Sequence, residues 1–273
     1  MTKRQITDAR NQRVVKANQF IREARYSLTV RQQRLILYLI SMIQREDDDF
    51  HEYEISIQDY CKICGIKHSG ELYQEIEDSI RELRDKSIGW VTLENGERPL
   101  LAWLEKARWT ASGFIRVRLD ADLKPFLLEL KSRFTSYQLV NILQFRSKYS
   151  TRLYELACSY NYRNESDGYV KTFKVDELQE LLSAKYAEYR DFKRRVLNPA
   201  ISEINRYTDT ILTLIERRQG KRVVGLEISI RRKSGPELTE YNRTIEERFG
   251  PEQLTLWNRV SKGVNLEDLD KIK

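Results

Sequence analysis

The stretch Phe173–Arg232 decides the fold: FKVDELQELLSAKYAEYRDFKRRVLNPAISEINRYTDTILTLIERRQGKRVVGLEISIRR. Apolar residues at 178, 181 and 182 have helical spacing, and Asp176 with Gln179 forms a capping-box pattern at the start of this short helix. After a turn at 183–185, the sequence predicts a second helix over 191–204.

Two segments rich in branched residues follow, at 211–215 and 223–230, and both are typical of strands. The basic segment 216–222 joins them as a hairpin. A helix, a turn, a helix and a hairpin make a winged helix. The second helix of this motif is shaped to enter a major groove, and the wing tip can lie on the backbone or in the minor groove.

The charge of this region supports the same interpretation. Residues 185–233 hold 13 Lys/Arg against six Asp/Glu, a net +7 that equals the formal charge of the whole chain. On a single basic helix the simpler interpretation is a solvated helix face. Here the basic residues fall on two elements, the second helix and the wing, which the motif brings to one surface. The pattern therefore favours nucleic-acid binding.

The bulk composition is that of a soluble, charge-rich globular protein. A chain of 273 residues with 40% hydrophobic and 33% charged residues has room for two domains. A pI near 9.2 makes a polyanion the natural partner. The first residues lack the apolar segment of a signal peptide, and the longest apolar run, 35–40, is too short to span a bilayer. The odd number of cysteines, three, fits a reducing cytoplasm.

The first half of the chain repeats the opening motif. Residues 55–64 match 173–182, and residues 79–83 match 200–204, at offsets of 118 and 121 residues. Ser56 with Asp59 is expected to cap the first helix of this copy, which Gly65 ends, and Ser69 is expected to cap the second. Strands are predicted at 88–93, at 114–119 and within 101–110. The fold class is therefore α+β, with tandem winged-helix domains related by an internal repeat.

A long helix is predicted at the start of each copy. Thr29 with Gln32 forms a capping box before an apolar helix at 35–43, and Thr135 with Gln138 forms another before a helix at 139–160. The predicted domains are a basic flexible arm at 1–13, a first winged helix at 14–120, a second at 121–233 that is the main DNA reader, and a peripheral extension at 234–273 with short helices around 244–249 and 254–260.

Other kinds of site are weighed and set aside. Cys64 aligns with Leu182, a core position, and Cys61 with Cys64 lacks a zinc-binding two-pair spacing, so no metal site is expected. The glycines at 65 and 70 have P-loop spacing, but Glu-Leu replaces Lys-Ser/Thr, so no nucleotide cofactor is expected either. No paired-histidine motif accompanies a tyrosine nucleophile. The sequence therefore predicts no catalytic residues and no cofactor.

The residues expected to contact DNA follow from the helical phase of about 100° per residue. Phe192, Val196, Leu197, Ala200, Ile201 and Ile204 define the buried side of the second helix. Arg194 and Asn198 point away and are the strongest candidates for base edges, since arginine pairs with guanine and asparagine with adenine. Lys193 falls toward the apolar side and would have to snorkel, and Pro199 is expected to shift these faces by kinking the helix. The expected contacts on this helix are Arg190, Lys193, Arg194, Arg195 and Asn198. On the wing they are Arg217, Arg218, Lys221 and Arg222, which are expected on phosphate or in the minor groove.

The corresponding helix of the first copy is acidic. Residues 67–86 hold four Lys/Arg against six Asp/Glu. Weaker DNA contacts are expected from Lys67, Ser69, Tyr73 and Gln74 at its start. The alternative is that this domain serves mainly as a dimer interface.

The chain resembles the plasmid replication initiator (Rep) family of iteron-binding proteins with two winged helices. The resemblance covers roughly residues 13–233. It rests on Val14-Val15-Lys16-Ala17-Asn18 leading to Tyr26-Ser27-Leu28-Thr29 and Gln33-Arg34-Leu35, on Leu83-Arg84-Asp85-Lys86-Ser87, on Asp191-Phe192-Lys193-Arg194-Arg195-Val196-Leu197 and on Glu203-Ile204-Asn205.

The resemblance implies a non-enzymatic function in the bacterial cytoplasm, with association to plasmid DNA and the nucleoid. It implies binding of a monomer to directly repeated origin sites, origin melting, and recruitment of the host initiator and replicative helicase. It also implies a dimer that represses its own promoter at an inverted repeat. Three alternatives stay open: a winged-helix repressor without a replication role, a DNA nicking or strand-transfer enzyme, and structured RNA as the partner.

Overall fold

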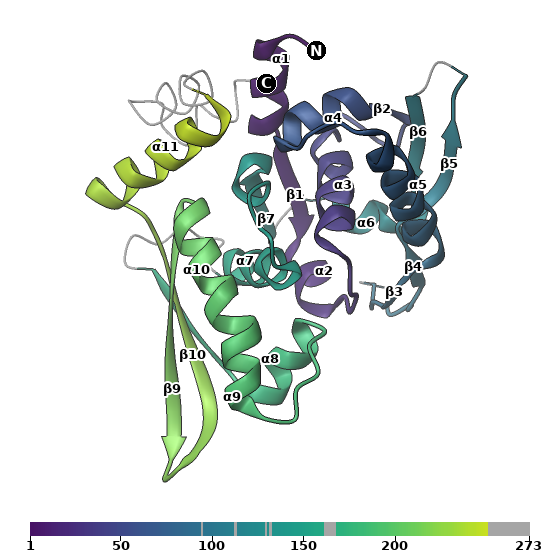
Figure 1. The fold of residues 1–273 in the computed structure, drawn as a ribbon. Helices are drawn as coiled ribbons and strands as arrows, with labels where there is room; N and C mark the ends of the chain where they lie inside the picture. Colours follow the sequence, from purple (N-terminus) through teal and green to yellow (C-terminus); the bar gives the residue numbers. More distant parts are fainter. Residues whose placement is uncertain (94, 112–113, 129, 131–132, 161–167, 251–273) are drawn as a thin grey trace.

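Two copies of one strand–helix–helix–hairpin unit make up about half of the chain, and the hairpin of the second copy projects away from the body (Figure 1). The computed structural model describes residues 1–93, 95–111, 114–128, 130, 133–160 and 168–250. Unit 1 consists of β2 (Tyr53–Ser56), α4 (Ile57–Cys64), α5 (Gly70–Asp85), β5 (Leu104–Trp109) and β6 (Phe114–Leu119). Unit 2 consists of β8 (Tyr169–Phe173), α8 (Val175–Leu181), α9 (Tyr189–Phe192), α10 (Asn198–Tyr207), β9 (Thr210–Gln219) and β10 (Arg222–Arg232).

The two units share one sheet topology. Their antiparallel sheets have the orders β2-β6-β5 and β8-β10-β9, so in each the strand before the helices pairs with the last strand of the hairpin. Ile55 lies opposite Ile115 in unit 1, and Phe173 lies opposite Leu226 in unit 2. The predicted internal repeat and the α+β tandem winged-helix fold are confirmed.

Local capping signals fix the helices of unit 1. The Ser56 hydroxyl accepts a hydrogen bond from the Asp59 backbone N–H at 3.2 Å, and Ser69 caps α5 in the same way. Gly65 ends α4 in the left-handed region at φ +62°, where a glycine carries no Cβ penalty. In unit 2 the predicted cap is wrong by two residues. Lys174 precedes α8, and its backbone N–H donates to the Glu177 carboxylate at 3.1 Å.

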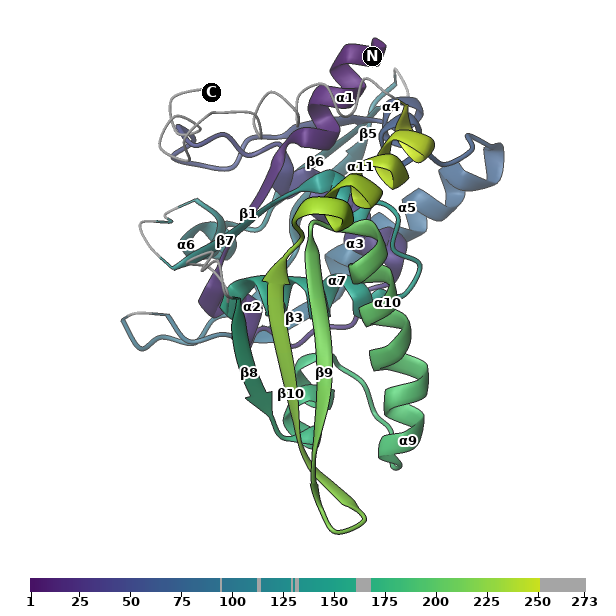
Figure 2. The ribbon, with the colours of Figure 1, turned by 90° about the vertical axis from the view of Figure 1, so that its left-hand side faces the viewer.

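The remaining elements join and flank the units (Figure 2). They are α1 (Lys3–Asn11), β1 (Arg13–Ala17), α2 (Asn18–Glu23), α3 (Val30–Ser41), β3 (Ser87–Trp90), β4 (Leu100–Ala102), the 3₁₀ turn η1 (Ala121–Leu123), α6 (Lys124–Leu127), β7 (Phe134–Gln138), the 3₁₀ turn η2 (Leu139–Ile142), α7 (Lys148–Tyr160) and α11 (Gly235–Phe249). The predicted strand at 88–93 stops at residue 90, and the region 101–110 contains two strands, β4 and β5.

The capping box predicted at Thr135 is wrong. Residues 134–138 form strand β7, which pairs with β1 so that Lys16 lies opposite Thr135. The Thr135 hydroxyl donates to the Asn18 side chain at 2.6 Å instead of capping a helix. The second long helix therefore begins only at Lys148, because pairing with a distant strand outweighs the local signal.

The flexible arm predicted at 1–13 is also wrong. Residues 3–11 form α1, with a capping box between Thr2 and Gln5, and Arg10 is only 7% exposed. The Arg10 guanidinium donates to the Ile63 carbonyl oxygen at 2.8 Å and to the Lys62 carbonyl, at the end of α4. These bonds reach carbonyls in the last turn of α4, and they attach α1 to unit 1.

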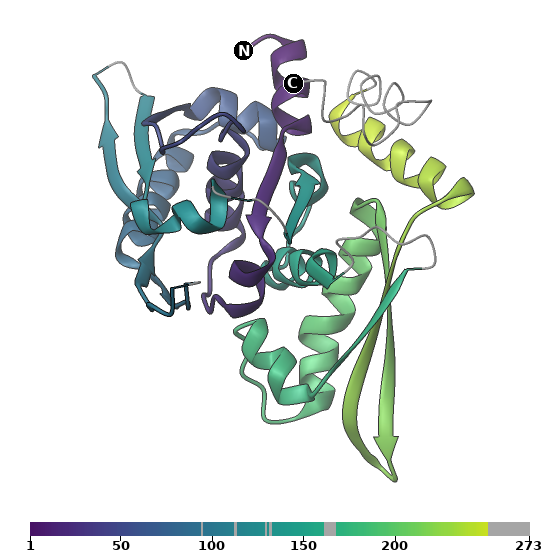
Figure 3. The same cartoon turned by 180° about the vertical axis from the view of Figure 1, so that it is seen from behind.

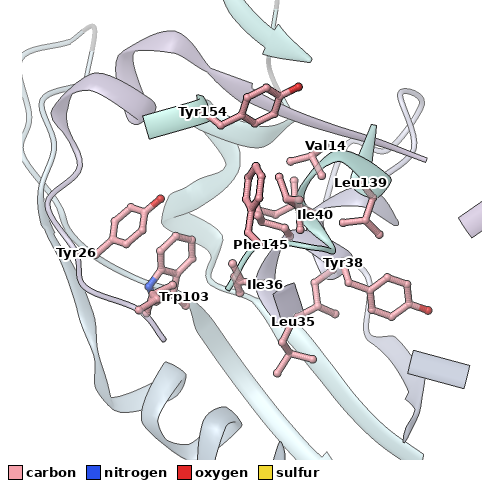
Figure 4. Packing of buried hydrophobic residues seen from close by; sticks show 14 of the residues in the cluster. Val14, Tyr26, Leu35, Ile36, Tyr38, Ile40, Trp103, Leu139, Phe145 and Tyr154 are labelled. Carbon is pink, nitrogen blue, oxygen red and sulfur yellow. The ribbon is translucent and has the colours of Figure 1, made fainter. Parts of the chain in front are cut away.

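One continuous core runs through both units. Figure 4 shows part of this core around α3. Helix α3, with the predicted cap of Thr29 and Gln32, lies at its centre and is buried along most of its length. Around it, Tyr26 and Trp103 meet edge to face with ring centroids 4.9 Å apart, and Phe145 meets Tyr154 in the same way at 6.2 Å. The two units are therefore packed on a shared interior.

A buried ion pair lies between β1 and α7. The Lys16 ammonium is 2.5 Å from the Glu155 carboxylate, both side chains are 1% exposed, and the Tyr137 hydroxyl donates to the same carboxylate at 2.6 Å. Such a pair is tolerated inside a protein when further hydrogen bonds satisfy both charges.

Within the described ranges, no helix has both the length and the apolar character that crossing a membrane requires.

Candidate nucleic-acid interface

The recognition helix of unit 2 presents a polar face opposite a fully buried one. It comprises α9, the π-helical turn η3 (Lys193–Leu197) and α10. Its buried face is formed by Phe192, Val196, Leu197, Ala200 and Ile204, each 0% exposed. Arg190, Arg194, Arg195 and Asn198 are all exposed. The helical phase predicted from the sequence is confirmed for these residues, except that Ile201 is only half-buried.

A wide turn interrupts this helix directly before Pro199. The Asn198 N–H donates to the Lys193 carbonyl, five residues back, as in a π-helix. Proline has no N–H and its ring crowds the preceding turn, so the wider turn accommodates it at the start of α10. The shift predicted near Pro199 therefore takes the form of a π-helical turn, which lies next to the candidate base-contacting residues.

A single carboxylate connects the recognition helix to the wing. Glu216 on β9 accepts hydrogen bonds from the Lys193 ammonium at 2.7 Å, from the Tyr189 hydroxyl at 2.8 Å and from Arg218. The bond from Lys193 is the main cause that lowers the pKa of Glu216 to about 2, although partial burial opposes the shift. Lys193 does snorkel as predicted, but its charge is directed to the wing rather than to solvent.

The wing ends in an exposed basic tip. Strands β9 and β10 meet at Gly220, whose φ of +60° suits glycine, and a bulge at Val223–Gly225 interrupts their pairing. Lys221 and Arg222 are exposed at this tip, and Figure 1 shows the tip as the part of unit 2 farthest from unit 1.

Several of the predicted cations already carry a carboxylate partner. Arg217 lies 2.5 Å from Glu227 on the paired strand, and Arg194 lies 2.8 Å from Asp191 one helical turn earlier. The arginine of each pair is about two-thirds exposed, so the pair contributes little to stability and the arginine can exchange its carboxylate for a phosphate. Glu216, Glu227 and Asp191 were missed by the sequence reasoning, and only the i,i+3 spacing of Asp191 and Arg194 could have indicated one of them.

In unit 1, most of the side chains predicted to contact DNA already make contacts within the protein. The Ser69 hydroxyl accepts from the Leu72 N–H at 3.4 Å as the cap of α5, and the Gln74 side chain donates to Asp78 at 3.3 Å. The half-buried Tyr73 stacks on Trp109, with ring centroids 6.2 Å apart. Lys67 is exposed. The structure brings these residues together at the start of α5, where they stay predicted contacts.

The two cysteines considered for metal binding are part of the hydrophobic core. Cys61 and Cys64 are buried, and burial raises the pKa of the Cys64 thiol to about 12. Across the described part of the chain, no three His, Cys, Asp or Glu side chains gather as metal ligands would.

Fold and surface together define a tandem winged-helix protein whose exposed basic groups concentrate on the recognition helix and wing of unit 2. The chain belongs to the initiator replication protein (Rep) family. The family model described as "Initiator Replication protein, WH1" matches residues 13–158, and "Initiator Rep protein, WH2" matches residues 174–230. The resemblance noted from the sequence is thereby confirmed. The boundary between domains at residue 120 stays a prediction, although the first match continues through β7 and α7.

Known proteins similar to the chain include two from Escherichia coli. A "Replication initiation protein" is 25% identical over 215 residues, which cover 75% of this chain and 65% of that protein. A "PI protein" is 29% identical over 131 residues, or 42% of this chain and 43% of that protein. The chain thus spans less than two thirds of either relative. A solved structure, "Crystal structure of Pi initiator protein in complex with iteron DNA", has the same fold, with a TM-score of 0.67, 19% identity, and coverage of 83% of this chain and 99% of that one.

Proposed function

We propose that this protein is a plasmid replication initiator that binds double-stranded DNA sequence-specifically at repeated origin sites. The recognition helix of unit 2 enters a major groove, and the wing follows the flanking backbone or minor groove. Unit 1 adds a second, weaker contact through the start of α5. No chemical step is required of the protein, because binding free energy from several copies distorts the adjacent duplex.

One arrangement supports this proposal above all. Arg190, Arg194, Arg195 and Asn198 project from one side of a helix whose opposite side is fully buried. A rigidly packed helix with a basic, hydrogen-bonding face is what a major groove accepts. The family membership and the fold shared with an initiator solved on iteron DNA point to the same ligand.

The contacts divide into two kinds. Arg194 and Asn198 are assigned to base edges, because their side chains can pair bidentately with guanine and adenine. Arg217, Arg218, Lys221 and Arg222 are assigned to phosphate, where they set affinity and salt dependence rather than sequence preference.

The finer functions come from the family. They are opening of the origin, repression of the protein's own promoter as a dimer, and contacts with the host initiator and replicative helicase. Each would use the DNA-bound form, so DNA binding is the first property to test.

The test is footprinting on the plasmid that carries this gene, with Arg194→Ala beside the original protein. Loss of one base-contacting arginine is expected to cost about 1–3 kcal/mol of binding free energy. Arg243→Ala on α11 is a matched control. Both arginines are about two-thirds exposed and lie 2.7–2.8 Å from an acid three residues earlier in the chain.

Protection of several direct repeats, weakened by Arg194→Ala and not by Arg243→Ala, supports an initiator. Protection of a single inverted repeat at a promoter would indicate a repressor instead. Strand cleavage, or equal binding by the Arg194→Ala protein, would contradict the proposal.

A further inference from the structure

Helix α11 lies outside both regions that match the family and crosses from unit 2 to unit 1 (Figure 3). Its start is fixed at the base of the wing, where the Arg231 guanidinium forms two bonds of 2.6 and 2.7 Å to the Glu237 carboxylate. The peripheral extension predicted for residues from 234 onward is therefore a packed helix over 235–249. The predicted helix at 254–260 lies outside the described residues.

The middle of α11 is buried against the segment between the units. Tyr241 is 3% exposed, and its hydroxyl donates to the Asn141 side chain at 2.6 Å. Asn141 in turn donates to the Tyr154 hydroxyl at 2.8 Å. Ile245, 2% exposed, packs with Val140 and Tyr241. These contacts fix the orientation of α11 relative to the segment between the units.

The last turn of α11 lies on the helix-turn-helix turn of unit 1. The Arg248 guanidinium donates to the Gly65 carbonyl oxygen at 2.8 Å. The Phe249 ring lies 4.2 Å from the guanidinium of Arg10, which itself binds the last carbonyls of α4. A Cβ on Gly65 would come within 3.2 Å of the Phe249 ring, so the ring packs closely against the backbone of this turn.

This turn leads directly to the candidate DNA contacts of unit 1. Gly65 lies two residues before Lys67 and four before Ser69, the cap of α5. Turns that connect two helices are held by few contacts of their own, so a guanidinium and a ring from another element limit their movement. The wing of unit 2 and the turn of unit 1 are thus connected through a single packed helix.

We propose that Arg248 and Phe249 are positioning residues that fix the turn of unit 1 relative to the wing of unit 2, so that both units meet one DNA duplex at a set spacing. This inference rests on the proposed function. When two binding elements are held at the spacing of their targets, the second contact forms at high effective concentration and loses little entropy. Loss of the connection weakens joint binding and leaves each unit's own contacts unchanged.

The test compares the full-length protein with the double variant Arg248→Ala/Phe249→Ala on two duplexes. One carries the whole protected site, and the other is shortened to the part protected by unit 2. The variant is expected to bind the whole site about tenfold more weakly and the short duplex equally well. The single variant Arg248→Lys keeps a donor and should bind the whole site more tightly than the double variant. Arg243→Ala, on the exposed face of α11, should change the affinity for neither duplex.

A second readout does not depend on DNA. Amide hydrogen exchange of the free protein is expected to become faster at residues 66–72 in the double variant, and to stay unchanged in the recognition helix of unit 2. Unchanged exchange at this turn overturns the inference whether or not the protein binds DNA. Equal weakening on both duplexes also overturns it, since that result would show general damage to unit 2. Absence of specific binding by the original protein would instead refute the proposed function.

Discussion

Replacing Glu216 by glutamine tests how the recognition helix is held against the wing. The carboxylate is 12% exposed and accepts bonds from Lys193, Tyr189 and Arg218. Glutamine has nearly the same shape, so the substitution removes the charge and one of the two acceptor oxygens while the packing is kept. It leaves the Lys193 ammonium without its counter-charge at a site where that charge is partly withdrawn from water.

The magnitude follows from the pKa. A fall from 4.5 to about 2 corresponds to a ceiling of about 3 kcal/mol in the free energy of unfolding. Lys193 and Arg218 are 39% and 55% exposed, so solvent screens both pairs, and we expect a loss of about 1–2 kcal/mol. Because the pKa is lowered in the folded state, this contribution is complete above pH 4.5 and is lost as the pH falls from 4.5 to 2.

Urea unfolding at pH 7 and pH 3 measures this directly. Glu216→Gln should lower the free energy of unfolding at pH 7, and the difference from the original protein should shrink by roughly half or more at pH 3. Glu227→Gln is the control, because that carboxylate pairs with Arg217 within the wing and should cost less. A glutamine variant as stable as the original at pH 7, or a loss that is the same at both pH values, would refute the role assigned to Glu216.

Three further predictions concern single residues of the core and the turns. Arg152→Met should lower the melting temperature measured by calorimetry. Arg152 is 3% exposed, and its loss leaves buried backbone carbonyls without their donor at a cost of about 3 kcal/mol. An unchanged melting temperature would contradict its role in the core. Gly168→Ala should destabilise the protein in urea by about 2 kcal/mol or more, since φ is +78° and the new Cβ would meet the Ile230 carbonyl oxygen at 2.4 Å; Gly220→Ala, with φ +60° and open space, should cost about 1 kcal/mol. The Cys64 thiol, with its pKa raised to about 12, should react with an alkylating reagent at pH 8 only after urea unfolds the protein, and rapid labelling of the native form would show that the thiol is accessible.

The sequence predicted those parts of the fold that depend on neighbours in the chain. Ser56 and Ser69 cap helices where expected, because a hydroxyl three residues before an N–H is a local signal. Thr135 carries the same signal and lies in a strand, since its pairing with Lys16 is set by residues more than a hundred positions away. Arg10 shows the same limit, because nothing near it in the sequence indicates that it binds carbonyls at the end of α4.

The candidate site divides in the same way. The exposure of Arg194 and Asn198 follows from helical periodicity and from the apolar residues between them. The partner of Lys193 could not be predicted, because Glu216 lies 23 residues further along and reaches the helix only when the wing folds back. Periodicity thus indicates which side chains face outward, while only the tertiary structure shows which charges are already neutralised.

The pairing of β1 with β7 also constrains how the chain can fold during synthesis. Residues 13–17 complete their ladder only with residues 134–138, and the ammonium of Lys16 finds its carboxylate only at residue 155. A ribosome adds about 5–20 residues per second, so β1 waits several seconds, unpaired, for its partner strand. The core between the units therefore cannot be completed before α7, the long helix that leads into unit 2, has emerged.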